Sequence, residues 1–147
     1  MRTTFFAGSF DPFTLGHKDI ADRVLAMFDR LVIGIGYNEY KAGRRSLPER
    51  IAAIKRIYEG DSRVSVVTYT GLTANAAAEA GACCLVRGVR DTRDFEYEKA
   101  IAEVNRRLFG IETLLLFADP SLSYVSSSMV SELEHHGYDV SQFLPGK

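Results

Sequence analysis

The ten residues from Gly8 to His17 constrain this chain more than any other segment. They join an apolar run, Thr3–Ala7, to an amphipathic stretch, Lys18–Phe28, through a loop rich in glycine, serine, aspartate, proline and threonine. The pattern predicts a first strand, a loop and a first helix. Ligands of open α/β sheets bind at such junctions, at the carboxyl ends of the strands. Because free N–H groups at a helix N-terminus favour anions, we expect a phosphate site here.

The rest of the chain continues the alternation of strand-like and helix-like segments. Further strands are predicted over Leu31–Tyr37, Arg63–Tyr69, Cys83–Val86 and Thr113–Phe117. Helices are predicted over Leu47–Tyr58, Thr73–Glu79, Asp94–Leu108 and Ser126–His135, with a short final turn over Val140–Phe143. This order predicts an α/β fold, a doubly wound five-stranded parallel sheet with helices on both faces. No repeat or long linker divides the sequence, so residues 1–147 are expected to form a single domain.

Charge and cysteine usage exclude several classes of partner. The 18 basic and 19 acidic residues give a net charge of −1, so nothing draws the chain as a whole to nucleic acid or to an anionic membrane. No apolar run is long enough to cross a bilayer, and no leader-like segment precedes the first strand. Cys83 and Cys84 are adjacent, and we interpret them as two small buried side chains rather than a disulfide. These features predict a cytoplasmic protein with no nucleic-acid or membrane partner.

A second informative segment follows the fourth predicted strand. Arg87–Arg90 reads RGVR, and it is followed by Asp94–Glu98, which reads DFEYE. Arginine at the carboxyl end of a strand can hold phosphate oxygens through two parallel hydrogen bonds. Two surface arginines in an ordinary turn are the structural alternative. Asp94 and Glu98 lie four residues apart and therefore share one helix face.

These segments together resemble a known family. Thr14–His17, after the GSFDP turn of Gly8–Pro12, is similar to the TxGH signature of the nucleotidylyltransferase superfamily. The RGVR and DFEYE segments, together with the serine-rich Ser123–Ser128, resemble the phosphopantetheine adenylyltransferases. The resemblance extends from Thr3 to Pro145. It implies a Rossmann-like strand order, a homohexamer, and adenylyl transfer from ATP to 4′-phosphopantetheine, giving dephospho-coenzyme A and pyrophosphate in the penultimate step of coenzyme A synthesis.

The resemblance also implies three overlapping sets of site residues. The catalytic set is His17, Lys41 and Arg87. The ATP-binding set is Ser9, Phe10, His17, Gly88, Val89, Arg90, Glu98, Ser123, Tyr124, Val125, Ser126, Ser127, Ser128 and Met129. The substrate-binding set is Ser9, Lys41, Thr73 and Arg87. No cluster with metal-ligand spacing occurs in the sequence, so Mg²⁺ is expected to arrive on the nucleotide phosphates.

Several of these residues have a structural alternative. Lys41 is either a phosphate ligand or an exposed loop lysine, and Arg44 or Arg45 could share its role. Thr73 either contacts the pantetheine side of the substrate or caps the following helix, and the serines of Ser123–Ser128 would equally serve as N-caps.

The predicted fourth helix offers alternatives of the same kind. Asp94 is expected mainly to favour the helix dipole. Ile101 and Val104 either line the pantetheine pocket with Asn105 or form a core stripe with Leu108. The adjacent His135 and His136 of the last helix are interpreted as surface residues, since neighbouring helical side chains do not face one metal.

The absence of a Ser-His-Asp or Cys-His set agrees with the implied reaction. A phosphate acceptor is already anionic at neutral pH, so catalysis reduces to holding two anions together and stabilising charge on the equatorial oxygens. A transferase acting on a different phosphate, a non-catalytic nucleotide-binding module and a purely structural oligomer are the rival hypotheses. Coenzyme A as an inhibitor is left open.

Overall fold

Five parallel strands form one sheet in the order β3-β2-β1-β4-β5 in the computed structural model, which describes residues 1–146. The strands are β1 (Thr3–Gly8), β2 (Arg30–Gly36), β3 (Val64–Tyr69), β4 (Cys84–Val89) and β5 (Glu112–Phe117). The helices are α1 (Leu15–Leu25), α2 (Leu47–Ile57), α3 (Thr73–Glu79), α4 (Thr92–Phe109) and α5 (Ser127–His135), followed by a 3-10 turn at Ser141–Phe143. The predicted fold class is confirmed. Strand order reverses between β1 and β4, and such a switch point opens a crevice for ligands.

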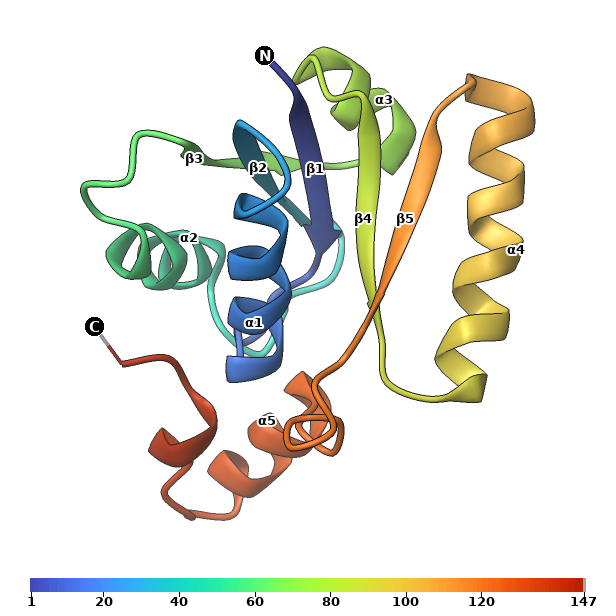
Figure 1. Ribbon diagram of the computed structural model, residues 1–147. Helices are drawn as coiled ribbons and strands as arrows, with labels where there is room; N and C mark the ends of the chain where they lie inside the picture. The colour runs from blue at the N-terminus through green and yellow to red at the C-terminus, as the bar shows by residue number, and fades with distance from the viewer. Residues whose placement is uncertain (147) are drawn as a thin grey trace.

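The two faces of the sheet carry separate apolar cores. Phe5 and Phe6 of β1 point to opposite faces, because side chains alternate along a strand. Phe6 packs with residues of α1 and α2, including Val24 and Ile54, while Phe5 packs with Ala77 of α3. Figure 1 shows α1 in front of the sheet, with α4 running along its β5 edge. The edge of the sheet at which ligands are expected to bind is therefore supported by a packed apolar layer on each face.

Several predicted boundaries of helices and strands are wrong by a few residues, and some side chains predicted to be buried are exposed. Helix α1 begins at Leu15 rather than Lys18, and it ends at Leu25, so Met27 lies beyond the helix and is 54% exposed. Strand β4 continues to Val89, so the RGVR segment is mostly strand rather than turn. Cys83 precedes β4 and is exposed, and only its neighbour is buried.

Of the two alternatives for the apolar stripe of α4, the core stripe is wrong. Ile101, Val104 and Leu108 are 39%, 51% and 71% exposed. The helix packs against β4 and β5 at the edge of the sheet, and Glu98 is its buried residue. Periodicity identifies an apolar helix face without specifying what covers it.

The C-terminal segment adds a small third cluster, in which Val125, Val130 and Val140 pack together. No helix within residues 1–146 combines the length and the apolar character that a membrane span requires.

Candidate active site

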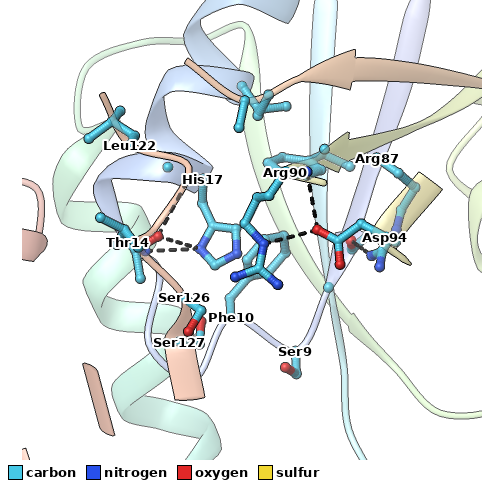
Figure 2. A pocket seen from close by; sticks show the side chains of 18 of the residues that line it. Ser9, Phe10, Thr14, His17, Arg87, Arg90, Asp94, Leu122, Ser126 and Ser127 are labelled. Atoms are coloured by element: carbon cyan, nitrogen blue, oxygen red, sulfur yellow. Dashed lines mark hydrogen bonds and ion pairs between the residues drawn. The ribbon is translucent and has the colours of Figure 1, made fainter. Parts of the chain in front are cut away.

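A cavity of about 300 Å³ lies at the carboxyl ends of β1 and β4. Its walls come from the β1–α1 loop, the end of β4, the first turns of α4 and the start of α5 (Figure 2). The predicted site residues that line it are Ser9, Phe10, His17, Arg87, Gly88, Arg90, Glu98, Val125, Ser126, Ser127 and Ser128. Segments far apart in the sequence thus meet at the predicted edge of the sheet.

His17 is fixed by the way helix α1 begins. Thr14 is the N-cap residue, and its hydroxyl accepts from the His17 backbone N–H at 3.5 Å. The Thr14 backbone N–H in turn donates to His17 Nδ1 at 2.9 Å, which completes a capping box. Because Nδ1 is the acceptor, the neutral ring carries its proton on Nε2. Figure 2 shows the ring at the cavity wall, beside Arg90.

The surroundings of His17 keep it neutral. Burial among Phe6, Phe10 and Phe13, with the Phe10 ring 5.0 Å away edge-on, disfavours the charged form. Burial first, and then the positive charges of Arg87 and Arg90, lower the pKa of His17 from 6.5 to about 4. At neutral pH the side chain is therefore an uncharged hydrogen-bond donor.

The loop that precedes His17 has an uncommon backbone. Phe10 has φ of 47°, in the left-handed region that non-glycine residues rarely adopt. Such a conformation costs on the order of 1–3 kcal/mol and persists only where packing determines it. The Phe10 ring is 2% exposed and contacts Phe6, Phe13 and His17, which provides that packing.

Arg87 is held by a buried carboxylate. Its Nε and Nη2 donate to the two Glu98 oxygens at 2.9 and 2.7 Å, and its Nη1 donates to the Ala7 carbonyl. Burial alone would lower the pKa of Arg87, but the pairing with Glu98 raises it above its usual value. Three of the five guanidinium N–H groups are used in this way, which leaves two for a ligand.

Arg90 is oriented by Asp94. Its backbone N–H and its Nε both donate to Asp94 Oδ2, at 3.1 and 3.0 Å. Burial opposes ionisation of this carboxyl, but the bonds and charge of Arg90 hold the pKa of Asp94 below its usual value. The cap of α4 is Asp91, which accepts from the Asp94 N–H at 2.8 Å. Asp94 therefore has a role beyond the expected interaction with the helix dipole, because it orients Arg90 at the cavity wall.

A second cavity of about 250 Å³ adjoins the first. The two share Ala7, Gly8, Ser9, Arg87 and Glu98 as lining residues. The further walls of the second cavity are formed by Gly36, Tyr69, Thr73, Leu85, Tyr97, Ile101, Ala102, Asn105 and Thr113. The bidentate ion pair thus stands between two adjoining cavities, of which the second has the more apolar lining.

Thr73 lines the second cavity and does not cap its helix. The N-cap position of α3 is Leu72, with no side-chain cap bond, and the Thr73 hydroxyl lies 2.8 Å from the Tyr69 hydroxyl. Tyr69 is absent from the predicted site residues, although its place at the last residue of a predicted strand is a signal that could have identified it.

The structure leaves some predicted site residues outside both cavities. Val89 is buried within β4, and Ser123, Tyr124 and Met129 line neither cavity. Lys41 is exposed on the β2–α2 loop. The side chains of its neighbours are engaged elsewhere, since Arg44 donates to the Ser128 carbonyl at 3.4 Å and Arg45 pairs with Glu134 at 2.5 Å.

Comparison with known proteins identifies the family. A family model described as cytidylyltransferase-like matches residues 5–133. A protein of Porphyromonas gingivalis named phosphopantetheine adenylyltransferase is 51% identical over 140 residues, which cover 95% of this chain and 92% of the relative. The chain belongs to the phosphopantetheine adenylyltransferases. A family member of the same name from Bacteroides thetaiotaomicron is 45% identical, and the match covers 99% of this chain and 96% of the relative.

Solved structures of other adenylyltransferases share the fold. A putative nicotinate-nucleotide adenylyltransferase from Vibrio parahaemolyticus superposes with a TM-score of 0.64 at 17% identity, over 99% of this chain and 95% of that one. A bifunctional NMN adenylyltransferase/ADP ribose pyrophosphatase from Francisella tularensis gives 0.72 at 13% identity, over 97% of this chain and 44% of that one. At these identities the likeness concerns the fold alone, so among these comparisons the sequence relatives distinguish the phosphopantetheine family from other nucleotidyltransferases.

Proposed function

We propose that this protein transfers the adenylyl group of ATP to 4′-phosphopantetheine, giving dephospho-coenzyme A and pyrophosphate in a reversible reaction. The observation that carries the proposal is the pair of adjoining cavities, which share the β1–α1 loop and the Arg87–Glu98 ion pair. Two substrates bound one in each cavity would meet beside a single arginine. The names of the relatives supply the two substrates.

ATP is assigned to the first cavity. The start of α5 faces it with the serine side chains of Ser126–Ser128, and unpaired N–H groups at a helix start favour phosphate. Arg90 adds a positive charge at the wall, held there by Asp94. The reacting α-phosphate is assigned to His17, whose Nε2 proton is available because Nδ1 is occupied.

The acceptor is assigned to the second cavity. Its lining combines the apolar Ile101 and Leu85 with the polar Thr73 and Asn105, which suits the alternating methylene and amide groups of a pantetheine arm. The acceptor phosphate would lie toward Arg87, where the two cavities adjoin. Lys41, from the β2–α2 loop, is proposed to reach the same phosphate.

The proposed chemistry is a direct in-line displacement. An oxygen of the acceptor phosphate forms a bond to the α-phosphorus as the bond from that phosphorus to the β-phosphate oxygen breaks, and pyrophosphate leaves. The nucleophile is anionic at neutral pH, so the site needs no general base. The rate gain comes from positioning and from donors aimed at the charge that develops on the α-phosphate. A neutral His17 gives such a hydrogen bond without altering the ionisation of the site.

Mg²⁺ is proposed to enter with ATP and to neutralise its phosphates. Within residues 1–146 no group of three or more His, Cys, Asp or Glu side chains is placed to hold a metal ion. The two cavity carboxylates, Asp94 and Glu98, are each paired with an arginine. These residues fit an ion carried by nucleotide phosphates better than an ion held by the protein.

A homohexamer is the assembly that we propose, and the exposed apolar face of α4 supports an association of copies. Leu108, 71% exposed, and Val104, 51% exposed, lie on this face. Leu108→Asp is expected to reduce the assembly mass in solution. Met27→Asp, which changes an apolar side chain outside α4, is the control. An unchanged mass for Leu108→Asp would remove this face from the assembly.

The deciding experiment measures pyrophosphate release with Mg·ATP and 4′-phosphopantetheine, with CTP and other phosphate acceptors in parallel. Release with that pair alone supports the proposal, and inhibition by added coenzyme A is tested in the same assay. Release with a different pair would make the protein another nucleotidyltransferase. ATP binding without turnover would make it a binding module. A cytoplasmic location is part of the same proposal.

A further inference from the structure

The carboxylate of Asp11 joins two loops at the edge of the sheet. Its Oδ2 accepts the backbone N–H of Arg44 at 2.7 Å, and its Oδ1 accepts that of Arg45 at 2.8 Å. Both bonds are short, as expected for an ionised acceptor. The approach is so close that a Cβ at Gly43 would lie 2.7 Å from Oδ2. The loop that contains Ser9 is thereby attached to the end of the loop that carries Lys41.

The same short segment is attached to α5. The Asp11 carbonyl accepts from Ser131 Oγ at 3.2 Å, and the Pro12 carbonyl accepts from Ser127 Oγ at 2.7 Å. The Arg45–Glu134 ion pair joins the β2–α2 loop directly to α5. Three segments that are distant in sequence are therefore held together as one unit.

Lys41 lies between two points at which hydrogen bonds hold the β2–α2 loop. At one end the Tyr37 N–H donates to the Tyr69 carbonyl at 3.1 Å, and at the other end stands Asp11. Between them Asn38 forms a turn, with its side chain accepting the Tyr40 N–H at 2.9 Å and its carbonyl accepting the Lys41 N–H at 3.2 Å. Among residues 1–146 the Lys41 ammonium has no ion-pair partner. Its position therefore depends on the hydrogen bonds that hold the backbone of its loop.

We infer that Asp11 is a positioning residue, which holds Lys41 in register with the β1–α1 loop so that the acceptor phosphate is gripped beside the ATP phosphates. The inference rests on the proposed function, because it takes Lys41 to be a ligand of the acceptor phosphate. Asp11 itself acts through its two N–H partners and contacts neither substrate. Its loss should therefore reduce the use of 4′-phosphopantetheine far more than the use of ATP.

The test is a double-mutant cycle of Asp11→Asn and Lys41→Ala on the full chain. Asp11→Asn should raise the KM for 4′-phosphopantetheine on the order of tenfold and leave the KM for ATP within about twofold, since it removes one of the two hydrogen bonds and places an NH2 group against a backbone N–H. In the Lys41→Ala background the same change should have little further effect, because residues that act through one another are not additive. Independent, multiplying effects would overturn the inference, as would an equal rise in both KM values.

Amide hydrogen exchange provides a readout that does not need turnover. Asp11→Asn should speed exchange at the Arg44 and Arg45 amides, and unchanged exchange there would refute the anchor. Asp139→Asn is the matched control, since Asp139 also accepts a backbone N–H, that of Ser141 at 3.0 Å, away from both cavities.

A second variant covers the case in which Asp11→Asn folds poorly. Gly43→Ala keeps the charge, and its added Cβ must displace the Asp11 carboxylate or the loop. It should reproduce the selective rise in the KM for 4′-phosphopantetheine, and an unchanged KM would refute the inference. A wild-type protein that turns over neither substrate would instead refute the proposed function, and the exchange measurement would still test the anchor.

Discussion

The β1–α1 junction and the β2–α2 loop each supply one basic residue of the proposed phosphate site, and they hold it in different ways. His17 is fixed by its own neighbours, through the capping box with Thr14 and the packing of three phenylalanine rings. Lys41 is exposed, and its loop is anchored by residues outside it, chiefly Asp11. Under the proposed function, the donor to the developing charge lies on the rigid element, and the cation that binds the arriving acceptor phosphate lies on the loop. The contrast indicates that catalysis and capture make different demands on precision.

The largest expected effect tests the rigid side of this contrast. Replacing His17 with alanine should lower kcat on the order of 10²–10³-fold, because a preorganised donor to the α-phosphate is lost. The KM for ATP should change much less, since other groups hold the nucleotide. Steady-state kinetics measures both parameters, and His135→Ala, at an exposed position of α5, is the control. Near-normal turnover by His17→Ala would contradict its assigned role.

Acid should destabilise the protein through the same residue. Between pH 6.5 and about 4 the unfolded chain binds a proton on His17 that the folded protein does not bind. The free energy of unfolding should therefore fall as pH drops through this range, by as much as about 3 kcal/mol, and then level off with respect to this group. Denaturant unfolding of wild type and His17→Asn at pH 7 and pH 5 isolates the effect. Equal acid sensitivity of the two proteins would argue against a neutral, buried histidine.

Removing the cap tests whether stability and catalysis are joined at the junction. Thr14→Ala should lower the free energy of unfolding by about 1 kcal/mol, the usual loss for an N-cap, and should also lower kcat because the His17 ring is less constrained. Ser46→Ala removes the matching cap of α2, where Ser46 and Glu49 form the same capping box. It should cost similar stability and leave kcat unchanged, so parallel losses of kcat in the two variants would point to general loosening.

A substitution in the β2–α2 loop should have the smallest effect, and this effect should be on substrate binding rather than on kcat or stability. Lys41→Ala should raise the KM for 4′-phosphopantetheine on the order of tenfold and leave the free energy of unfolding within about 0.5 kcal/mol. The difference from wild type should shrink as salt is added, because an exposed charge is screened. Lys55→Ala, at an exposed position of α2, is the control. A fall in kcat as large as that of His17→Ala would remove the distinction between the two regions.

Local chemistry explains which predictions were accurate. The strand, loop and helix around His17 depend on residues within a few positions of one another, so the sequence predicts their order, although α1 begins at Leu15, three residues before its predicted start. The α/β order is equally local, since each segment carries its own periodicity. The structure then brings Ser9, Arg87 and Ser126 to one cavity, as expected of loops that meet at one edge of a parallel sheet.

Errors arose where distant residues decide the outcome. For the apolar stripe of α4 the sequence left a core role and a pocket role open, and the core role is wrong because Leu108 is 71% exposed. A periodic pattern identifies an apolar helix face without telling an inner face from an exposed one. The sequence left Thr73 open between a substrate contact and a helix cap, and the structure pairs its hydroxyl with that of Tyr69 of β3. The boundary of β4 moved because its pairing with β5, up to the partners Val89 and Phe117, extends the strand.

The sequence by itself therefore determined the fold class, the family resemblance and the identity of most residues at the cavity wall, because these depend on local pattern and on motif. Only the tertiary structure decided the states of those residues. Burial and two arginines make His17 neutral, Glu98 turns Arg87 toward the shared wall, and Asp11 reaches across 33 positions to anchor the loop of Lys41. Charge and orientation depend on what surrounds a side chain in space, and the order of residues along the chain does not contain that information.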